Sequence, residues 1–128
     1  MNLWVPTRSV VITIAILSLG SLVIYPADLA TGKWDCTGKG VSDQDVDFVL
    51  DLKQSGEEIT GTITYGSDVV DIEKGSIHGN KLEIVIVTND NRYVSSGSLE
   101  DNKITGTWTD ERGRTGTWKG QKQAQGGN

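Results

Sequence analysis

Few residues in this chain are of a type that could perform chemistry. The 128-residue sequence has one histidine, His78, and one cysteine, Cys36. A cysteine–histidine nucleophile pair needs the two side chains in contact and the base oriented by a buried partner, whereas His78 stands beside a Gly-Asn turn. Ser95, Ser96 and Ser98 have no histidine partner on a strand. The sequence therefore predicts no catalytic residue, and we do not expect an enzyme.

Acidic residues at alternate positions are the nearest approach to a metal-binding pattern. Asp43, Asp45 and Asp47 have this spacing, but an EF-hand loop would need a glycine next and a glutamate further on. Phe48 and Val49 follow instead. On a strand, alternate residues share one face, so a solvated acidic face that discourages edge pairing is the main interpretation, with weak calcium binding as the lesser one. We expect no metal site and no cofactor.

Cys36 and the net charge limit the remaining function classes. A single cysteine cannot form an intrachain disulfide, so Cys36 is either a small buried apolar residue or an intermolecular bridge or reactive thiol. The net charge is −5, and Arg8 and Asp28 cancel within residues 1–31, so the excess lies in the rest of the chain. An acidic domain without a basic stripe repels phosphate backbones. We therefore do not expect a nucleic-acid partner.

Residues 1–26 are predicted to be a targeting segment. Arg8 provides a positive flank, and residues 10–24 form an uncharged apolar run. This run has the length of a signal-peptide core and falls short of the ~20 apolar residues of a bilayer span, although Trp4 and Tyr25 bracket it as interfacial aromatics would. The alternatives are a cleaved export signal, a retained membrane anchor through residues 10–24, and a cytosolic protein with a buried N-terminal helix. The first two place the domain outside the cytoplasm.

Residues 32–120 are predicted to form one all-β domain after a linker at 27–31. β-Branched and aromatic residues alternate with polar ones between Gly, Asn and Asp clusters, which is the pattern of strands and hairpins. Gly75 is expected to mark a bulge or bend. Residues 121–128 are polar and glycine-rich, and we expect a disordered tail there. The eight expected strands are 32–38, 46–53, 59–65, 69–74, 81–88, 92–99, 104–108 and 115–118.

Turn residues predict the registers of four hairpins. Two-residue loops are expected at 55–56, 79–80 and 101–102, and a three-residue loop at 111–113, in which Gly113 takes a left-handed conformation. Only the three-residue loop puts Trp118 and Trp108 on the same face, and it places Trp118 over Gly106, an aromatic–glycine fit known from sheets. The expected pairs are Leu52 with Ile59, Leu50 with Gly61, Phe48 with Ile63, Val46 with Tyr65, Ile77 with Leu82, Leu99 with Ile104, and Gly106 with Trp118.

We predict a single eight-stranded antiparallel up-and-down meander barrel, because closing the last strand onto the first removes both exposed edges. Eight strands enclose an interior that side chains just fill or that holds one small ligand. Trp34, Gly61, Gly106 and Trp118 are expected to be structural. A filled core is favoured by the bulky residues predicted to face inward: Phe48, Leu50, Leu52, Ile63, Ile72, Leu82, Ile84, Ile86, Trp108 and Trp118.

A small cavity is the alternative to the filled core. Tyr65, Tyr93 and Trp108 are predicted to face inward, and the two tyrosines stand near strand ends. Tyrosine hydroxyls at a barrel mouth can orient a small polar group, while the rings contact its apolar part. These three residues are therefore the candidate ligand contacts.

The first strand opens with Gly32-Lys33-Trp34, and the last ends with Gly116-Thr117-Trp118. The first motif resembles the G-x-W opening of lipocalins and the G-K-W opening of avidins, the calycin group of antiparallel barrels. Together, the two motifs look like those of small exported bacterial lipocalin-like domains. The resemblance implies that Trp34 packs at the closed end under a basic residue. The available basic residues near the last strand are Lys119, Lys122 and Arg114. Biotin binding is not implied, because the polar biotin contacts of avidins find no matching positions.

The leading functional prediction is a non-catalytic extracytoplasmic binding module. It would hold a small apolar or amphipathic ligand at the barrel mouth. The alternative is a structural or interaction domain at a membrane surface, with a filled core and no small ligand. A protease inhibitor, a role that some small exported lipocalin-like domains have, is a third interpretation.

Overall fold

The structure, a computed structural model, describes residues 26–124. Residues 1–25 of the expected targeting segment and 125–128 of the expected tail lie outside this range. Residues 26–124 include no helix long and apolar enough to cross a membrane. The strands in this part of the chain are β1 (Gly32–Lys39), β2 (Asp45–Ser55), β3 (Glu58–Tyr65), β4 (Asp68–Asp71), β5 (Lys74–His78), β6 (Lys81–Val87), β7 (Arg92–Glu100), β8 (Lys103–Asp110) and β9 (Thr115–Lys122).

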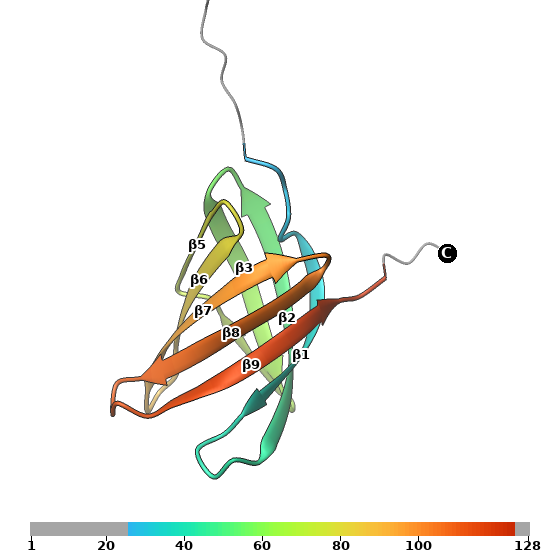
Figure 1. The fold of residues 1–128 in the computed structure, drawn as a ribbon. Helices are drawn as coiled ribbons and strands as arrows, with labels where there is room; N and C mark the ends of the chain where they lie inside the picture. Colours follow the sequence, from blue (N-terminus) through green and yellow to red (C-terminus); the bar gives the residue numbers. More distant parts are fainter. Residues whose placement is uncertain (1–25, 125–128) are drawn as a thin grey trace, which may run out of the picture.

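Eight of these strands close into an antiparallel barrel (Figure 1). β1 pairs with β2 on one side and with β9 on the other, and the pairing of β2 with β3 completes the ring. β4 lies outside the ring, because its residues pair with β3 alone. The predicted eight-stranded up-and-down barrel is confirmed, with one extra strand.

The extra strand arises where one strand was expected over 69–74. The structure has β4 and β5 there, interrupted at Ile72 and Glu73. β3 pairs with β4 through its second half and with β5 only at Glu58, after which β5 pairs with β6. Gly75, the expected bend, instead pairs regularly with Ile84. A Cβ on Gly75 would lie 2.7 Å from the carbonyl oxygen of Ile59, so this glycine permits a close approach rather than a bend.

The division of β4 from β5 leaves a seam in the barrel wall. Among the described residues, β4 has a ladder partner only on its β3 side, and Ile86 and Val87 of β6 pair only with β7. The last link across the wall is at Val85, which pairs with Lys74 and accepts a 2.9 Å hydrogen bond from the N–H of Glu73. Beyond this link, β4 and β6 are not paired with each other.

Three of the four predicted hairpin registers are confirmed. Ile77 pairs with Leu82, Leu99 with Ile104, and Gly106 with Trp118. Gly113 has a φ of 81° at the end of the three-residue loop, as that loop requires.

The fourth register, between β2 and β3, differs from the prediction by two residues. The turn is at 56–57 rather than 55–56, so Leu52 faces Gly61 and Leu50 faces Ile63. Gly56 has a φ of 63° at the first turn position. A shift of two residues keeps every side chain on its predicted face, so the inward set is unaffected.

The barrel has two unlike ends. The chain enters β1 and leaves β9 at one end, beside the turns at 56–57, 79–80 and 101–102; the loops at 40–44, 66–67, 88–91 and 111–114 lie at the other. The first end is closed, because the barrel beneath it is filled. The largest fully buried side chains are Trp34, Leu50, Ile59, Ile77, Leu82, Ile84 and Ile104.

Segments flanking the barrel are attached to the closed end. Gln54 of β2 accepts hydrogen bonds from the N–H groups of Leu29 and Ala30 and donates to the carbonyl of Ala27, so the expected linker is fixed to the barrel. β9 continues to Lys122, four residues past the expected end of this strand at 118 and two past the expected end of the domain at 120. The N–H of Gln123 then donates to the carbonyl of Lys33.

Candidate functional site

A cavity of about 480 Å³ opens at the end of the barrel opposite the chain ends. Small-molecule sites typically have volumes of about 300–1,000 Å³. Leu50, Ile84 and Trp118 form its floor and are buried, so the filled core and the cavity, which the sequence left as alternatives, each occupy one half of the barrel. The other apolar side chains that line the cavity are Val41, Val46, Phe48, Ile63, Tyr65, Val70, Ile86, Tyr93 and Trp108.

The seam between β4 and β6 explains why this half is hollow. Val70 of β4 and Ile86 of β6 both line the cavity, yet their strands do not pair with each other. The wall here lacks a ladder like the one that joins β5 to β6 in the closed half. Gly38 and Ser95, which also line the cavity, contribute little side-chain volume.

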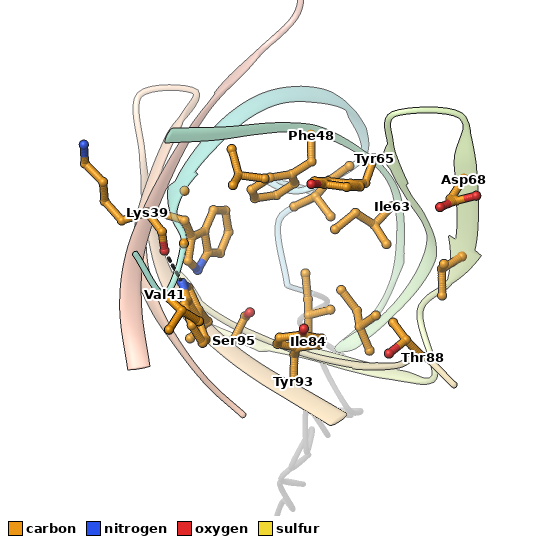
Figure 2. Close-up of a pocket in the computed structure, with 18 of the residues that line it drawn as sticks. Lys39, Val41, Phe48, Ile63, Tyr65, Asp68, Ile84, Thr88, Tyr93 and Ser95 are labelled. Carbon is orange, nitrogen blue, oxygen red and sulfur yellow. Dashed lines mark hydrogen bonds between the residues drawn. The ribbon is translucent and has the colours of Figure 1, made fainter. Parts of the chain in front are cut away.

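The three predicted ligand contacts, Tyr65, Tyr93 and Trp108, all line this cavity. The rings of Tyr93 and Trp108 pack edge to face, with centroids 6.0 Å apart and planes at 70°, a favoured aromatic geometry. Tyr65 stands at the rim and is 54% exposed. Figure 2 shows Tyr65 and Tyr93 on opposite walls of the opening. The structure therefore brings the three aromatic residues to one site.

Trp108 is held in place by a contact across the barrel wall. Its indole N–H donates a 3.1 Å hydrogen bond to the carbonyl of Lys39, at the end of β1. β9 lies between β8 and β1, and the indole passes over Gly116, where a Cβ would lie 2.6 Å from Nε1. Because its polar atom is already paired, Trp108 presents only apolar surface to the cavity.

Hydroxyl groups supply much of the polar part of the lining, together with the side chains of Gln44 and Asp68. Ser95 and Tyr93 lie on β7, and Figure 2 shows the Ser95 hydroxyl directed toward the space between the walls. Within residues 26–124, neither the Ser95 hydroxyl nor those of Tyr65 and Tyr93 make a side-chain hydrogen bond, whereas Thr88 donates to the carbonyl of Asn91. A few polar groups in an apolar cavity are typical of sites that orient a small amphipathic molecule.

Asp110, at the end of β8, fixes two of the loops around the mouth. Its buried carboxylate accepts hydrogen bonds from Asn91 Nδ2 at 3.0 Å, from Arg114 Nε at 2.7 Å and from the N–H groups of Arg112 and Arg114. Burial alone would raise the pKa of Asp110, but the bonds from Asn91 and Arg114 outweigh it and hold that pKa well below its usual range. The β6–β7 and β8–β9 loops are thereby tied together.

Several lining residues were not expected from the sequence. Val41 and Gln44 lie in the β1–β2 loop, and Asp68 begins β4. Loop residues have no periodicity that assigns them to a face. The one available signal was Val41, an apolar residue alone in a stretch of Gly, Ser, Asp and Lys.

Trp34 lies at the closed end of the barrel and does not line the cavity. The side chain is 0% exposed, and Nε1 donates a 2.8 Å hydrogen bond to the carbonyl of Ala30. Of the three basic candidates, Lys122 covers it, with Nζ 5.2 Å from the ring centroid. A lysine at this distance makes a favourable cation–π contact.

The remaining expected structural residues lie at close approaches of the backbone. A Cβ on Gly61 would collide with the carbonyl oxygen of Asp51, and one on Gly106 with that of Ser96. Trp118 packs over Gly106 and beside Phe48, with ring centroids 6.0 Å apart.

The residues considered for chemistry lie in separate surroundings. Cys36 is 3% exposed, and burial raises the pKa of its thiol to about 12, which fits the buried apolar interpretation. His78 is exposed and faces Glu57 at 3.1 Å. Asp45 pairs with Lys39, and Asp47 accepts from the Thr37 hydroxyl. The part of the chain that the structure describes holds no group of three or more His, Cys, Asp or Glu side chains placed to bind a metal.

No protein-family model and no curated protein matches this chain. Among solved structures, it is similar to a redesigned β-barrel, with a TM-score of 0.60 and 14% sequence identity. The match covers 74% of this chain and 92% of that protein. This likeness supports the small β-barrel fold and carries no information about function.

Proposed function

We propose that this domain is a non-catalytic binding module for a small apolar or amphipathic ligand. The observation that carries the proposal is the apolar cavity of about 480 Å³ at the open end of a barrel whose other half is filled. Because the other half of the barrel is filled, the cavity is closed at its floor. A ligand therefore enters and leaves through the mouth or the seam. The aromatic rings supply contact area, and the hydroxyls of Tyr65, Tyr93 and Ser95 orient a polar end.

Binding can be tested with a neutral fluorescent probe, N-phenyl-1-naphthylamine, on the purified domain. We expect fluorescence enhancement with the parent and a loss of affinity of about tenfold or more for Ser95→Phe, because a ring there fills the cavity. Ser96→Phe is the matched control, since Ser96 is the exposed neighbour on the opposite face of β7. Should Ser95→Phe fail to fold, Val70→Phe fills the same cavity from β4.

Native mass spectrometry of protein purified from its own host gives an independent test. We expect a co-purified small molecule in the parent and its loss in Ser95→Phe. A parent that carries no ligand and enhances no probe would overturn the proposed function.

We further propose a lipocalin-like, extracytoplasmic barrel. The Gly32-Lys33-Trp34 opening, the burial of Trp34 and its contact with Lys122 support the lipocalin-like part. The uncharged run at 10–24 after Arg8 supports export or membrane anchoring.

An interaction domain is the second candidate, and exposed apolar side chains near the mouth favour it. Val41 is 58% exposed, Tyr65 54% and Val69 64%. Val69 points away from the cavity, because its neighbour Val70 lines it. Val69→Lys should lower the affinity for a protein partner that binds this surface, whereas the affinity for the neutral probe should be unchanged.

A further inference from the structure

The charged side chains around the cavity indicate the charge of the polar group on its ligand. Two lining residues bear a charged side chain, Lys39 and Asp68. The Lys39 ammonium makes a 2.6 Å ion pair with Asp45. Figure 2 shows the Lys39 side chain extending away from the cavity, so Lys39 contributes its backbone and not its charge. Among the described residues that line the cavity, the remaining charged side chain is a carboxylate.

Asp68 stands directly opposite Tyr65 in the β3–β4 hairpin. Residues paired in this way have Cβ atoms about 4.5–5.5 Å apart on one face of the ladder, and both of these residues line the cavity. Within residues 26–124, the Asp68 carboxylate makes no ion pair and no side-chain hydrogen bond. Figure 2 shows Asp68 on the margin of the opening, on the β4 side.

Asp68 places a carboxylate at the rim of a cavity lined by aromatic rings, which is a favourable setting for a positively charged nitrogen. The carboxylate attracts the charge, and the ring face adds a cation–π contact. Tyr93 and Trp108 extend the aromatic surface across the mouth. The net charge of −5 adds a long-range field that attracts cations and repels anions. Among the lining residues of the described part of the chain, no cationic side chain faces the cavity to pair with a fatty-acid carboxylate.

We infer that the cavity selects cationic amphiphiles, molecules with an apolar body and a protonated amine, over carboxylates of the same length. This inference rests on the proposed function and adds the chemical class of the ligand. The apolar body lies between Phe48, Ile63 and Ile86, and the amine lies at the mouth between Asp68 and Tyr65.

A matched series tests the inference: dodecylamine, dodecanol and dodecanoate, each displacing N-phenyl-1-naphthylamine below its aggregation concentration. We expect dodecylamine to bind about tenfold more tightly than dodecanoate at low salt, with dodecanol between them. In Asp68→Asn the affinity for dodecylamine falls to that for dodecanol, whose own affinity is unchanged.

Asp71→Asn is the control, because it removes the same charge from the outward face of the same strand. An equal effect of Asp68→Asn and Asp71→Asn would mean that net charge alone acts, which overturns the site. Equal binding of all three compounds, or tighter binding of dodecanoate, would overturn the selectivity while leaving the proposed function standing. Failure of every compound, and of the probe itself, would overturn the proposed function.

Discussion

Trp34 joins three segments of the chain at the closed end of the barrel: β1, the residues before it, and the last residues of β9. Removing a buried tryptophan typically costs ~3–5 kcal/mol, and a domain of this size has only ~5–15 kcal/mol of stability. We expect Trp34→Ala to leave the domain unfolded or barely folded. Urea denaturation followed by far-UV circular dichroism measures this loss.

Tyr93→Phe is the control for Trp34→Ala, because it removes only a hydroxyl at the mouth. This variant should fold like the parent and change only ligand binding. If Trp34→Ala proved as stable as the parent, β1 would not be an integral strand of the barrel.

Gly106 allows Trp118 to lie across the β7–β8 pair. A Cβ there would collide with the carbonyl oxygen of Ser96 and lie 2.8 Å from Trp118 Nε1. Gly106→Val should therefore destabilise the domain by at least ~1–3 kcal/mol, the usual cost of overpacking. Thr107→Val, on the exposed face of the same strand, should change stability by less than ~0.5 kcal/mol. Equal melting temperatures for parent and Gly106→Val would contradict the packing of Trp118.

At the scale of strands and loops, Asp110 ties the two loops beside the cavity and makes stability depend on pH. Its pKa is lower in the folded state than in the unfolded state, so its contribution is complete above the unfolded value of ~3.9. The contribution is then lost as the pH falls from there through the folded value. We expect the stability of the parent to decrease below about pH 4 more steeply than that of Asp110→Asn. Urea titrations from pH 2 to 6 measure both slopes, and parallel slopes would show that this carboxylate is not the cause.

Hairpins were the most predictable elements, because their turns carry specific residues. Gly79-Asn80 and the glycine at 113 fixed their loops, and the structure has the expected pairs there. The β2–β3 turn was misplaced because registers two residues apart bury the same face, so the apolar pattern could not distinguish them.

The division of β4 from β5 could not be predicted from local sequence. Val70 and Ile72 continue the alternation of one strand, and the interruption at Ile72 and Glu73 arises because the chain leaves β3 to pair with β6. This change of partner depends on contacts between segments distant in the sequence. The seam and the cavity in the open half of the barrel follow from this change of partner, so the local sequence pattern could not predict them either.

At the scale of the whole molecule, the sequence predicted the aromatic strand residues of the candidate site but not its turn and loop residues. Tyr65, Tyr93 and Trp108 were predictable together, because strand alternation and barrel closure put them on the inward face near the same end. Asp68 and Val41 were not, because their positions depend on how a turn and a loop fold over the mouth.

The predicted targeting role of residues 1–26 can be tested on the full chain. Fusing residues 1–36 to a reporter that is active only outside the cytoplasm should give activity, and Leu17→Arg, which interrupts the uncharged run, should abolish it. Inactivity of the parent fusion would exclude export. Sequencing the mature N-terminus of the full chain then separates cleavage from anchoring, since cleavage predicts a start near Thr31.

The attachment of residues 27–30 to Gln54 determines how the barrel would be oriented if the preceding residues were held in a bilayer. The closed end of the barrel would face the lipid, and the mouth of the cavity, at the opposite end, would face water. A ligand could then not enter the cavity directly from the adjacent membrane leaflet. It would have to reach the mouth through the aqueous phase or be transferred by another carrier protein. The same arrangement lets the domain be immobilised through either flank, on a bead or a sensor chip, with its opening unobstructed.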